Sequence, residues 1–406
     1  MNKTTTTRAA AMLAAATLTT GAASTASAED YIWNVAEGVT ETIDAVAVAN
    51  IGAKDLVKTG RGKLISSNAM ASYTGTITVR EGAFEITTTG DLGTDAGGTF
   101  VENGGTLVVN MNGSSDSFRF ANEEVTIAGT GDAAYGAAVW QDSRWNSQFK
   151  IFAKLALSGD ATIFAGKRLG LDAGALTMNG YTLTLKGENF TFRTLSTPGT
   201  VGNIVSEAAL LSIYAGSYVV GDNSKTLTLQ NGATLKIGDP STSAVPGINW
   251  KLVVETGAKV TAEASHNRVY YGDVEWNSTV VDGASGPLAF NGQVTGTGTI
   301  KSSSATLAFA QPLGASLGLD LSGTATATLA PAAAYPYTHR GMKLVRRSGM
   351  TQDLSLFSDS RNDVNREYCA FGPGPQLDRS SYWEIDGQKS WCSHGYIWNR
   401  ESTNVT

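Results

Sequence analysis

The sequence predicts an all-β chain that folds as a right-handed parallel β-helix, a solenoid of stacked coils. Three observations support this fold class. Glycine makes up 46 of the 406 residues, about 11% where roughly 7% is usual, and only 16% of the residues are charged. Threonine alternates with aliphatic residues in many short segments. A short glycine-containing phrase also returns at intervals that fit one coil of a solenoid.

The alternation has a period of two residues, which indicates strands with one buried face. In the segment 76–79, Ile77 and Val79 point to one side of the strand, whereas Thr76 and Thr78 point to the other. A Thr-Leu-Thr-Leu pattern of the same kind occurs twice later in the chain. Within residues 31–329 no apolar stretch keeps a helical period over three turns, so we do not expect the crossover helices of an α/β fold.

The recurring phrase consists of a glycine, a small residue and then alternating apolar residues. It occurs at residues 81–86, 103–109, 173–178, 231–237 and 256–260. The step from Gly82 to Gly105 and the step from Gly232 to Gly257 are similar in length. Two or three short strands and their turns fill such a step. We therefore predict a β-helix over residues 29–337, with degenerate repeats of about 20–25 residues.

A β-sandwich or another multi-sheet all-β fold is the alternative. Such folds join sequential antiparallel strands by two-residue hairpins, for which Asn-Gly is a strong signal. Asn-Gly occurs five times, at residues 103–104, 112–113, 179–180, 231–232 and 291–292. The glycine phrase recurs at a coil-sized interval rather than pairing strands in mirror fashion, which favours the solenoid.

Residues 1–28 have the pattern of a secretory signal peptide. Lys3 and Arg8 form a short basic region, a small-residue apolar run follows, and Ala26-Ser27-Ala28 matches an A-x-A cleavage site. No later segment offers the roughly 20 consecutive apolar residues of a membrane span. We therefore expect an exported chain without a transmembrane segment after signal cleavage.

Residues 338–406 differ in composition from the rest of the chain. This tail has 17 charged residues in 69, and it contains both cysteines of the chain. Cys369 and Cys392 could form a disulfide in an oxidising compartment. We expect the tail to be a C-terminal cap over the last coil or a poorly ordered extension.

The stretch Lys58-Thr-Gly-Arg-Gly-Lys-Leu64 has the composition of a phosphate-binding loop but not its spacing. A P-loop requires G-x-x-x-x-G-K-[ST], whereas only Arg61 separates Gly60 from Gly62, and a leucine follows Lys63. A basic patch formed by Lys54, Lys58, Arg61 and Lys63 could meet an anionic polysaccharide or lipid headgroup. The favoured interpretation is a tight turn between strands, with the two lysines facing water.

Together with the segment that follows, this stretch resembles the autotransporter-associated β-strand repeat of bacterial surface and secreted proteins. The family pattern has a Lys-Thr-Gly-x-Gly-x-Leu turn, a Tyr-Thr-Gly turn, a strand and a Gly-x-Leu phrase, with phenylalanine here in place of that leucine. The matching positions are Lys58, Thr59, Gly60, Gly62, Leu64, Tyr73, Thr74, Gly75, Thr78, Val79, Gly82, Phe84 and Ile86.

The resemblance implies a parallel β-helix at the outer-membrane surface or outside the cell of a Gram-negative-type bacterium. The strong match is confined to the segment 56–86, and the repeat is structural, so the resemblance brings no catalytic residues. A C-terminal translocator domain, which true autotransporters have, is not recognisable in the sequence.

One cluster in the chain looks like a ligand site. Acidic and aromatic residues lie close together there and could bind a glycan by stacking and hydrogen bonding; they are His266, Tyr270, Tyr271, Asp273, Glu275 and Trp276. A carbohydrate-active enzyme would need two or three converging carboxylates. Within this cluster Asp273 and Glu275, separated by Val274, would share a strand face. A decorated loop on the solenoid is the simpler interpretation.

Other chemistry has little support in the sequence. Three histidines lie far apart and no metal-ligand spacing occurs, so we expect no metal and no cofactor. A net charge of −6 disfavours nucleic acid as a partner. We expect a non-enzymatic structural or adhesin-like protein that displays Thr, Ser and Asn to glycans or to other envelope proteins. A polysaccharide lyase or glycoside hydrolase and a non-catalytic carbohydrate-binding module are the alternatives.

Overall fold

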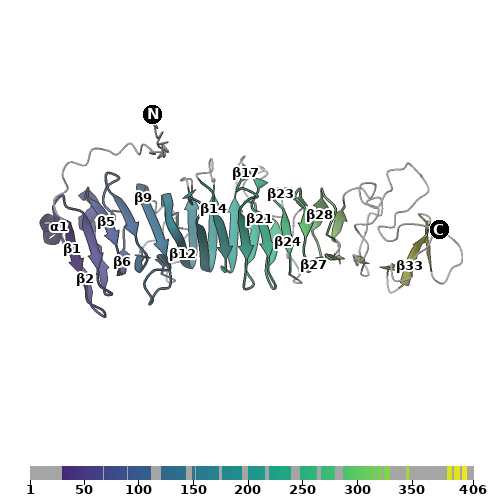
Figure 1. The fold of residues 1–406 in the computed structure, drawn as a ribbon, viewed down its shortest axis with the longest axis horizontal. Coiled ribbons are helices and arrows are strands. Elements are labelled where there is room, and N and C mark those ends of the chain that lie inside the picture. The colour runs from purple at the N-terminus through teal and green to yellow at the C-terminus, as the bar shows by residue number, and fades with distance from the viewer. Residues whose placement is uncertain are drawn as a thin grey trace, which may run out of the picture.

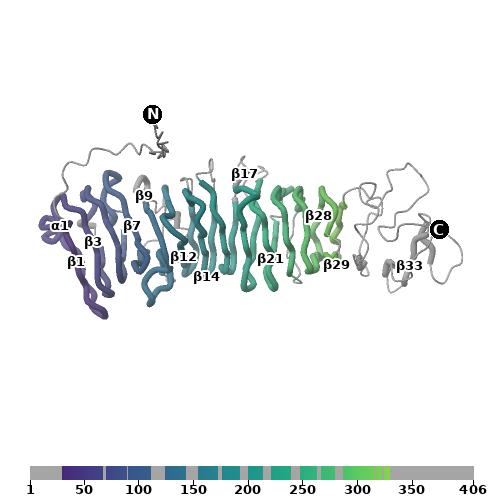
Figure 2. The backbone as a smooth tube through the Cα atoms, in the orientation of Figure 1, coloured from purple at the N-terminus to yellow at the C-terminus, as the bar shows by residue number. Residues whose placement is uncertain are grey.

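The computed structural model of the chain is a parallel β-solenoid, as the sequence predicts (Figure 1). Its coils stack into a rod, with strand β1 near one end and β28 toward the other (Figure 2). The structure describes residues 30–66, 68–88, 90–110, 120–142, 149–150, 152–172, 176–193, 200–214, 219–238, 247–262, 267–278, 287–314, 316–321, 324–329 and four short strands after residue 343. The proposed signal peptide and Cys369 lie outside these residues, so both predictions remain untested.

The strands form parallel ladders that run along the rod. Ladder 1 consists of β1 (Tyr31–Asn34), β3 (Leu56–Thr59), β5 (Thr76–Val79), β7 (Gly98–Val101), β9 (Phe120–Gly129), the start of β12 (Phe152–Asp172) and β13 (Leu176–Thr177). Ladder 2 consists of β2 (Thr40–Thr42), β4 (Lys63–Ile65), β6 (Gly82–Ile86), β8 (Gly105–Val109), β10 (Val139–Gln141), the middle of β12, β14 (Thr182–Arg193), β15 (Asn203–Ser206), β18 (Thr226–Leu229), β21 (Lys251–Val254), β24 (Val274–Trp276) and β26 (Val294–Thr295).

Three further ladders complete the described part of the rod. Ladder 3 has β11 (Phe149–Lys150), the ends of β12 and β14, β16 (Leu210–Tyr214), β19 (Thr234–Ile237) and β22 (Lys259–Ala262). Ladder 4 has β17 (Val219–Val220), β20 (Gly247–Ile248), β23 (Arg268–Tyr270), β25 (Leu288–Phe290), β28 (Thr306–Phe309) and β30 (Thr326–Thr328). Ladder 5 has β27 (Thr299–Ser302), β29 (Gly318–Leu321), β31 (Leu344–Arg346) and β32 (Tyr382–Ile385). After it, β33 (Gln388–Ser393) and β34 (Tyr396–Asn399) pair antiparallel with their neighbours.

The pairing excludes the sandwich alternative for the described part of residues 30–329. Every strand pair found there is parallel, whereas hairpins would give antiparallel pairs. Asn179-Gly180 and Asn231-Gly232 do have the positive φ angles typical of Asn-Gly turns. They join strands of different ladders, however, so each turns a corner of a coil rather than closing a hairpin.

The register agrees with the predicted coil length over much of the chain. Gly82 pairs with Gly105, as the spacing of the glycine phrase predicts. Leu107 pairs with Val139, so this coil is longer than the one before it and carries an insertion. Residues 130–138, at the end of that insertion, contact β8 through hydrogen bonds with Thr106 and Leu107.

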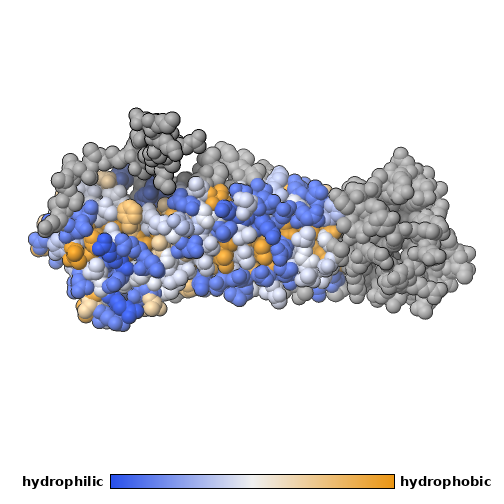
Figure 3. Space-filling model, viewed as in Figure 1, coloured by the Kyte–Doolittle hydropathy of each residue, from blue (hydrophilic) through white to orange (hydrophobic). Residues whose placement is uncertain are grey.

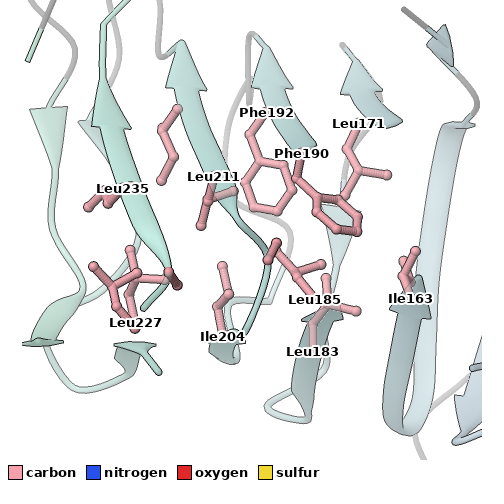
Figure 4. Packing of buried hydrophobic residues seen from close by; sticks show 14 of the residues in the cluster. Ile163, Leu171, Leu183, Leu185, Phe190, Phe192, Ile204, Leu211, Leu227 and Leu235 are labelled. Atoms are coloured by element: carbon pink, nitrogen blue, oxygen red, sulfur yellow. The ribbon is translucent and has the colours of Figure 1, made fainter. Parts of the chain in front are cut away.

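The core consists of files of apolar side chains that lie above one another in successive coils (Figure 4). In ladder 2 each member of one file pairs with the next, and all are fully buried: Leu64, Phe84, Leu107, Val139, Ile163 and Leu185. Parallel pairing places like positions about 4.8 Å apart, so each side chain packs against its counterparts in the neighbouring coils. This arrangement explains why the sequence repeats its apolar phase but not its exact residues.

The N-terminal end of the rod has a cap that the sequence analysis did not predict. Helix α1 (Ala45–Ile51) begins at Asp44, whose carboxylate accepts a hydrogen bond from Ala47 N, and buries Ile51. The first-coil rings of Tyr31 and Trp33 also pack against the core. The 3₁₀ helix η1 (Asn68–Ser72) contributes the fully buried Met70 to that core. Terminal coils of solenoids need such cover because no further coil packs on them.

Candidate functional site

The repeat-motif residues form a turn between β3 and β4, and here the structure corrects one prediction. Lys58 does not face water; its side chain is fully buried. Its Nζ donates hydrogen bonds to the carbonyl oxygens of Thr59, at 3.0 Å, and Gly60, at 2.6 Å. A third bond of 2.9 Å reaches Glu81 O in the next coil. The inward phase of β3 forces this placement, because Lys58 pairs with the inward-facing Trp33 and Val79.

The other motif residues have structural roles that fit the turn interpretation. The carbonyl oxygens of Gly60 and Gly62 face the backbone of Gly82 in the next coil, where a Cβ atom would lie 2.5 and 2.4 Å from them. Gly75 leaves room for the Tyr73 ring, whose hydroxyl lies 2.6 Å from Lys54 O. Leu64 and Phe84 are fully buried, as the sequence predicts.

Three of the four residues of the predicted basic patch do not form a free positive surface. Lys58 is buried, Lys63 Nζ lies 2.7 Å from Glu85 Oε2, and Arg61 Nε lies 3.8 Å from Asp132. Burial acts to lower the pKa of Lys63, but hydrogen bonds to Glu85 and then to Tyr135 outweigh it, so this pKa is raised. Each of these three cations therefore has an acceptor or an acidic partner within the described structure.

The predicted ligand surface is wrong for Tyr270 and Trp276, two of its three large aromatic residues. Tyr270 and Trp276 are 0% and 1% exposed, so neither ring can stack on a glycan. The Tyr270 hydroxyl donates to Trp250 O, and Trp276 Nε1 donates to Ser278 O. Tyr271 does lie at the surface, with 41% of its area exposed. His266 lies outside the described residues.

The two carboxylates of that surface face outward, and no third acidic side chain within the described part of the chain joins them in a cluster. Asp273 accepts hydrogen bonds from Asn223 Nδ2 at 3.0 Å and from Gln293 N at 2.9 Å. Glu275 lies 3.1 Å from Lys251 Nζ and 3.2 Å from Asn277 Nδ2. The hydrogen bonds from Lys251 and Asn277 lower the pKa of Glu275. A general acid needs a raised pKa instead, so this geometry does not suit Glu275 to protonate a leaving group.

We expect Glu275→Gln to change the free energy of unfolding by less than about 1 kcal/mol, because both partners of its ion pair are about 40% exposed. The lowered pKa means that the carboxylate stabilises the fold above its ordinary pKa of 4.5 and loses this effect as the pH falls. Urea unfolding at pH 7 and pH 2.5 should therefore show a small difference at pH 7 that shrinks as the pH falls below 4.5 and through the lowered pKa. A loss of several kcal/mol at both pH values would contradict this view of Glu275.

The structure brings together an aromatic cluster that sequence reasoning missed. Trp140 on β10 and Phe164 on β12 pair in register on the outer face of ladder 2. Their ring centroids are 5.9 Å apart and their planes differ by 7°. Tyr135 meets Trp140 edge to face, with centroids 5.5 Å apart. All three side chains are partly exposed. Their common outward phase is visible only when the coil register is known, because Trp140 follows the insertion.

The loop that carries Tyr135 is held against β8 by its backbone. Asp132 N donates to Thr106 Oγ1, and that hydroxyl donates in turn to Ala137 O. Asp132 Oδ1 accepts from Ala134 N and so closes a tight turn before the tyrosine. This turn thus positions Tyr135 beside Trp140.

These features define the class of protein as a parallel β-solenoid with polar and aromatic files on its outer face. No protein-family profile, curated protein or solved structure matches the chain. Among the described residues, no group of three or more His, Cys, Asp or Glu side chains could hold a metal ion. Nor does any helix among them have the length and apolar character to cross a membrane.

Proposed function

We propose that this chain is an exported structural or adhesin-like rod, placed at the outer surface of a Gram-negative-type bacterial cell or released from it, and that it acts without catalysis. The observation that carries the proposal is the repetition of small polar groups along the outer face of one ladder. The partners would be glycans or other envelope proteins.

Polar groups recur on the outer face of ladder 2, with valines between some of them. Thr182 pairs with Asn203, and Thr226 pairs with Lys251. Hydrophilic residues cover much of the visible surface, with apolar residues in small separate patches (Figure 3). Sites that recur about every 4.8 Å allow many weak contacts at once, which raises avidity without any strong single site.

Ion pairs link successive coils at several places along the rod. Examples are Lys63–Glu85, Arg80–Glu102, Lys167–Glu188, Lys186–Glu207, Lys251–Glu275 and Lys301–Asp320, and in each the basic residue belongs to the earlier coil. Each exposed pair contributes little stability. A shift of register would separate each pair, however, so together they favour one alignment of the coils.

The carbohydrate-active enzyme is less well supported. Its best carboxylates, Asp273 and Glu275, have amide, backbone and lysine partners rather than a second acid across a cleft. Hydrolysis needs paired carboxyl groups about 5–10 Å apart, with one kept protonated. The aromatic cluster separately supports the carbohydrate-binding alternative.

Expression of residues 1–406 in a Gram-negative host, followed by fractionation and N-terminal sequencing, tests the export step. We expect the protein in the periplasm, outer membrane or medium, beginning at Glu29. Uncut protein confined to the cytoplasm would overturn export. Incubation with a polysaccharide panel should release no reducing ends or unsaturated sugars. Release that Asp273→Asn or Glu275→Gln abolishes would overturn the non-catalytic role.

A further inference from the structure

The aromatic cluster of Tyr135, Trp140 and Phe164 presents apolar ring surface where ladder 2 otherwise presents polar groups. Trp140 lies in register between Val108, which is buried, and Phe164. Phe164 in turn pairs with Lys186. The strip of ring surface therefore spans the coils of Trp140 and Phe164 and ends at a charged residue. Large aromatic side chains that keep partly exposed faces are frequent in binding sites, because they offer contact area at low entropic cost.

Hydrogen-bonding groups border the cluster on both sides. On the N-terminal side, Glu85 accepts from Lys63 Nζ at 2.7 Å and from Asn110 Nδ2 at 2.8 Å. On the C-terminal side, Lys186 Nζ lies 3.6 Å from Glu207. The side chains of Lys63, Lys186 and Glu207 stay 33%, 43% and 28% exposed and can bond a ligand. Glu85 is nearly buried and holds Lys63 and Asn110 in place. A sugar presents the matching combination, with apolar C–H faces and hydroxyl groups at the rim.

The size and charge of the cluster select the occupant. A stable protein interface uses about 20–30 residues on each side, so three rings bordered by ion pairs are too few for a folded partner. The two bordering pairs each contain one cation and one anion, so they add no net charge. A polyanionic saccharide would gain nothing there, whereas a neutral one keeps the stacking and the hydrogen bonds.

We propose that Tyr135, Trp140 and Phe164, with the bordering pairs Lys63–Glu85 and Lys186–Glu207, form a binding site for a neutral pyranose oligosaccharide. The inference rests on the proposed function, since it supplies the ligand class for an adhesin-like rod. The rings pack against the C–H faces of one or two sugar units. The exposed side chains of Lys63, Lys186 and Glu207 bond the hydroxyl groups.

Isothermal titration of the full chain with neutral hexasaccharides of β-1,4-linked glucose, N-acetylglucosamine and mannose tests the site, with polygalacturonate as the anionic probe. We expect at least one neutral hexasaccharide to bind and polygalacturonate not to. Trp140→Leu and Phe164→Leu keep apolar contacts for folding but remove the flat rings, so each should weaken binding at least tenfold. Phe100→Leu is the matched control, since Phe100 is 43% exposed on ladder 1, and it should stay within twofold of the parent chain.

The outcomes separate this proposal from the proposed function. If no neutral hexasaccharide binds, or if binding survives both leucine substitutions, the site is overturned while an adhesin-like role on another face remains open. If a hexasaccharide binds and is cleaved, the non-catalytic function fails but the site stands. Thermal unfolding of each variant guards against loss of fold. Should Trp140→Leu unfold, Trp140→Phe retains a ring and Phe164→Leu still decides the question.

Discussion

Replacing Lys58 with methionine is expected to lower the free energy of unfolding by about 3 kcal/mol. Methionine fills nearly the same volume but cannot donate a hydrogen bond. The carbonyl oxygen of Thr59 would keep its hydrogen bond from Val35 N. The carbonyl oxygens of Gly60 and Glu81 would lose the hydrogen bond that Lys58 Nζ donates to each of them. The methionine variant no longer has to bury an ammonium group, and this offsets part of the loss in stability. The net effect therefore stays below the sum of three charged hydrogen bonds. Urea unfolding followed by circular dichroism measures the difference.

The stabilising effect of Lys58 should also depend on pH. Burial lowers the pKa of Lys58 to about 8, against the attraction of Glu81 and, more weakly, of Asp132 and Glu41. Below pH 8 the lysine is protonated in both the folded and unfolded states. Between about pH 8 and the ordinary value of 10.5 the unfolded chain binds more protons, so stability rises with pH relative to the methionine variant. The difference between the two proteins should widen across this interval.

Lys63→Met is the matched control for this prediction. Lys63 belongs to the same motif, but its side chain is one-third exposed and its ion-pair partner is Glu85. Its loss should cost about 1 kcal/mol or less. Equal effects of the two substitutions would show that Lys58 has no special role, and a flat pH dependence would contradict its lowered pKa.

The two lysines also show which features of the fold could be predicted from the sequence and which could not. The period-two alternation and the glycine spacing predict the strands, their parallel pairing and the buried leucine and phenylalanine of the motif, because these depend on local phase and on coil length. The same phase, applied to Lys58 on β3, places it inside the solenoid. A lysine is expected at the surface, however, even where the alternation places it on the inward face of a strand. Its burial becomes understandable only when its carbonyl acceptors in the turn and in the next coil are known.

The predicted ligand surface failed for a related reason. Glu275 faces outward, and strict alternation then places Trp276 in the core. The period-two pattern alone therefore predicts that Trp276 is buried. Grouping the residues by their nearness in the sequence obscured this difference between the two faces of the strand. Trp140 and Phe164 show the opposite difficulty, since they become neighbours only through pairing between coils, after one coil that carries an insertion. Single-sequence periodicity cannot locate an insertion inside such a coil, and so it cannot align the two rings.

Substituting alanine for Gly82 is expected to cost about 3–5 kcal/mol, the range in which backbone must move to relieve a clash. Gly82 has a φ of +64°, which a residue with a side chain adopts only at a cost of about 1–2 kcal/mol. Its Cβ would also lie 2.4 Å from Gly62 O and 2.5 Å from Gly60 O. Both atoms belong to backbone of the neighbouring coil, so no side chain can rotate away.

Gly136→Ala separates the two contributions. Gly136 has a φ of +65°, almost the same as Gly82, but no atom lies within 4 Å of the position that its Cβ would take. This control should therefore lose only the conformational part, about 1–2 kcal/mol. Similar losses for both variants would mean that close packing of coils at the motif turn does not matter.

The double variant Lys58→Met with Gly82→Ala tests whether the turn acts as a unit. Lys58 bonds Glu81 O, directly before Gly82, and Gly60 O faces both residues. A shift of this backbone in the alanine variant already disturbs the lysine bonds, so the second substitution has less left to remove. We expect the combined loss to fall short of the sum by about 1 kcal/mol or more, as contacting residues commonly do. Strict additivity in urea unfolding would show that the ammonium and the glycine stabilise the two coils independently.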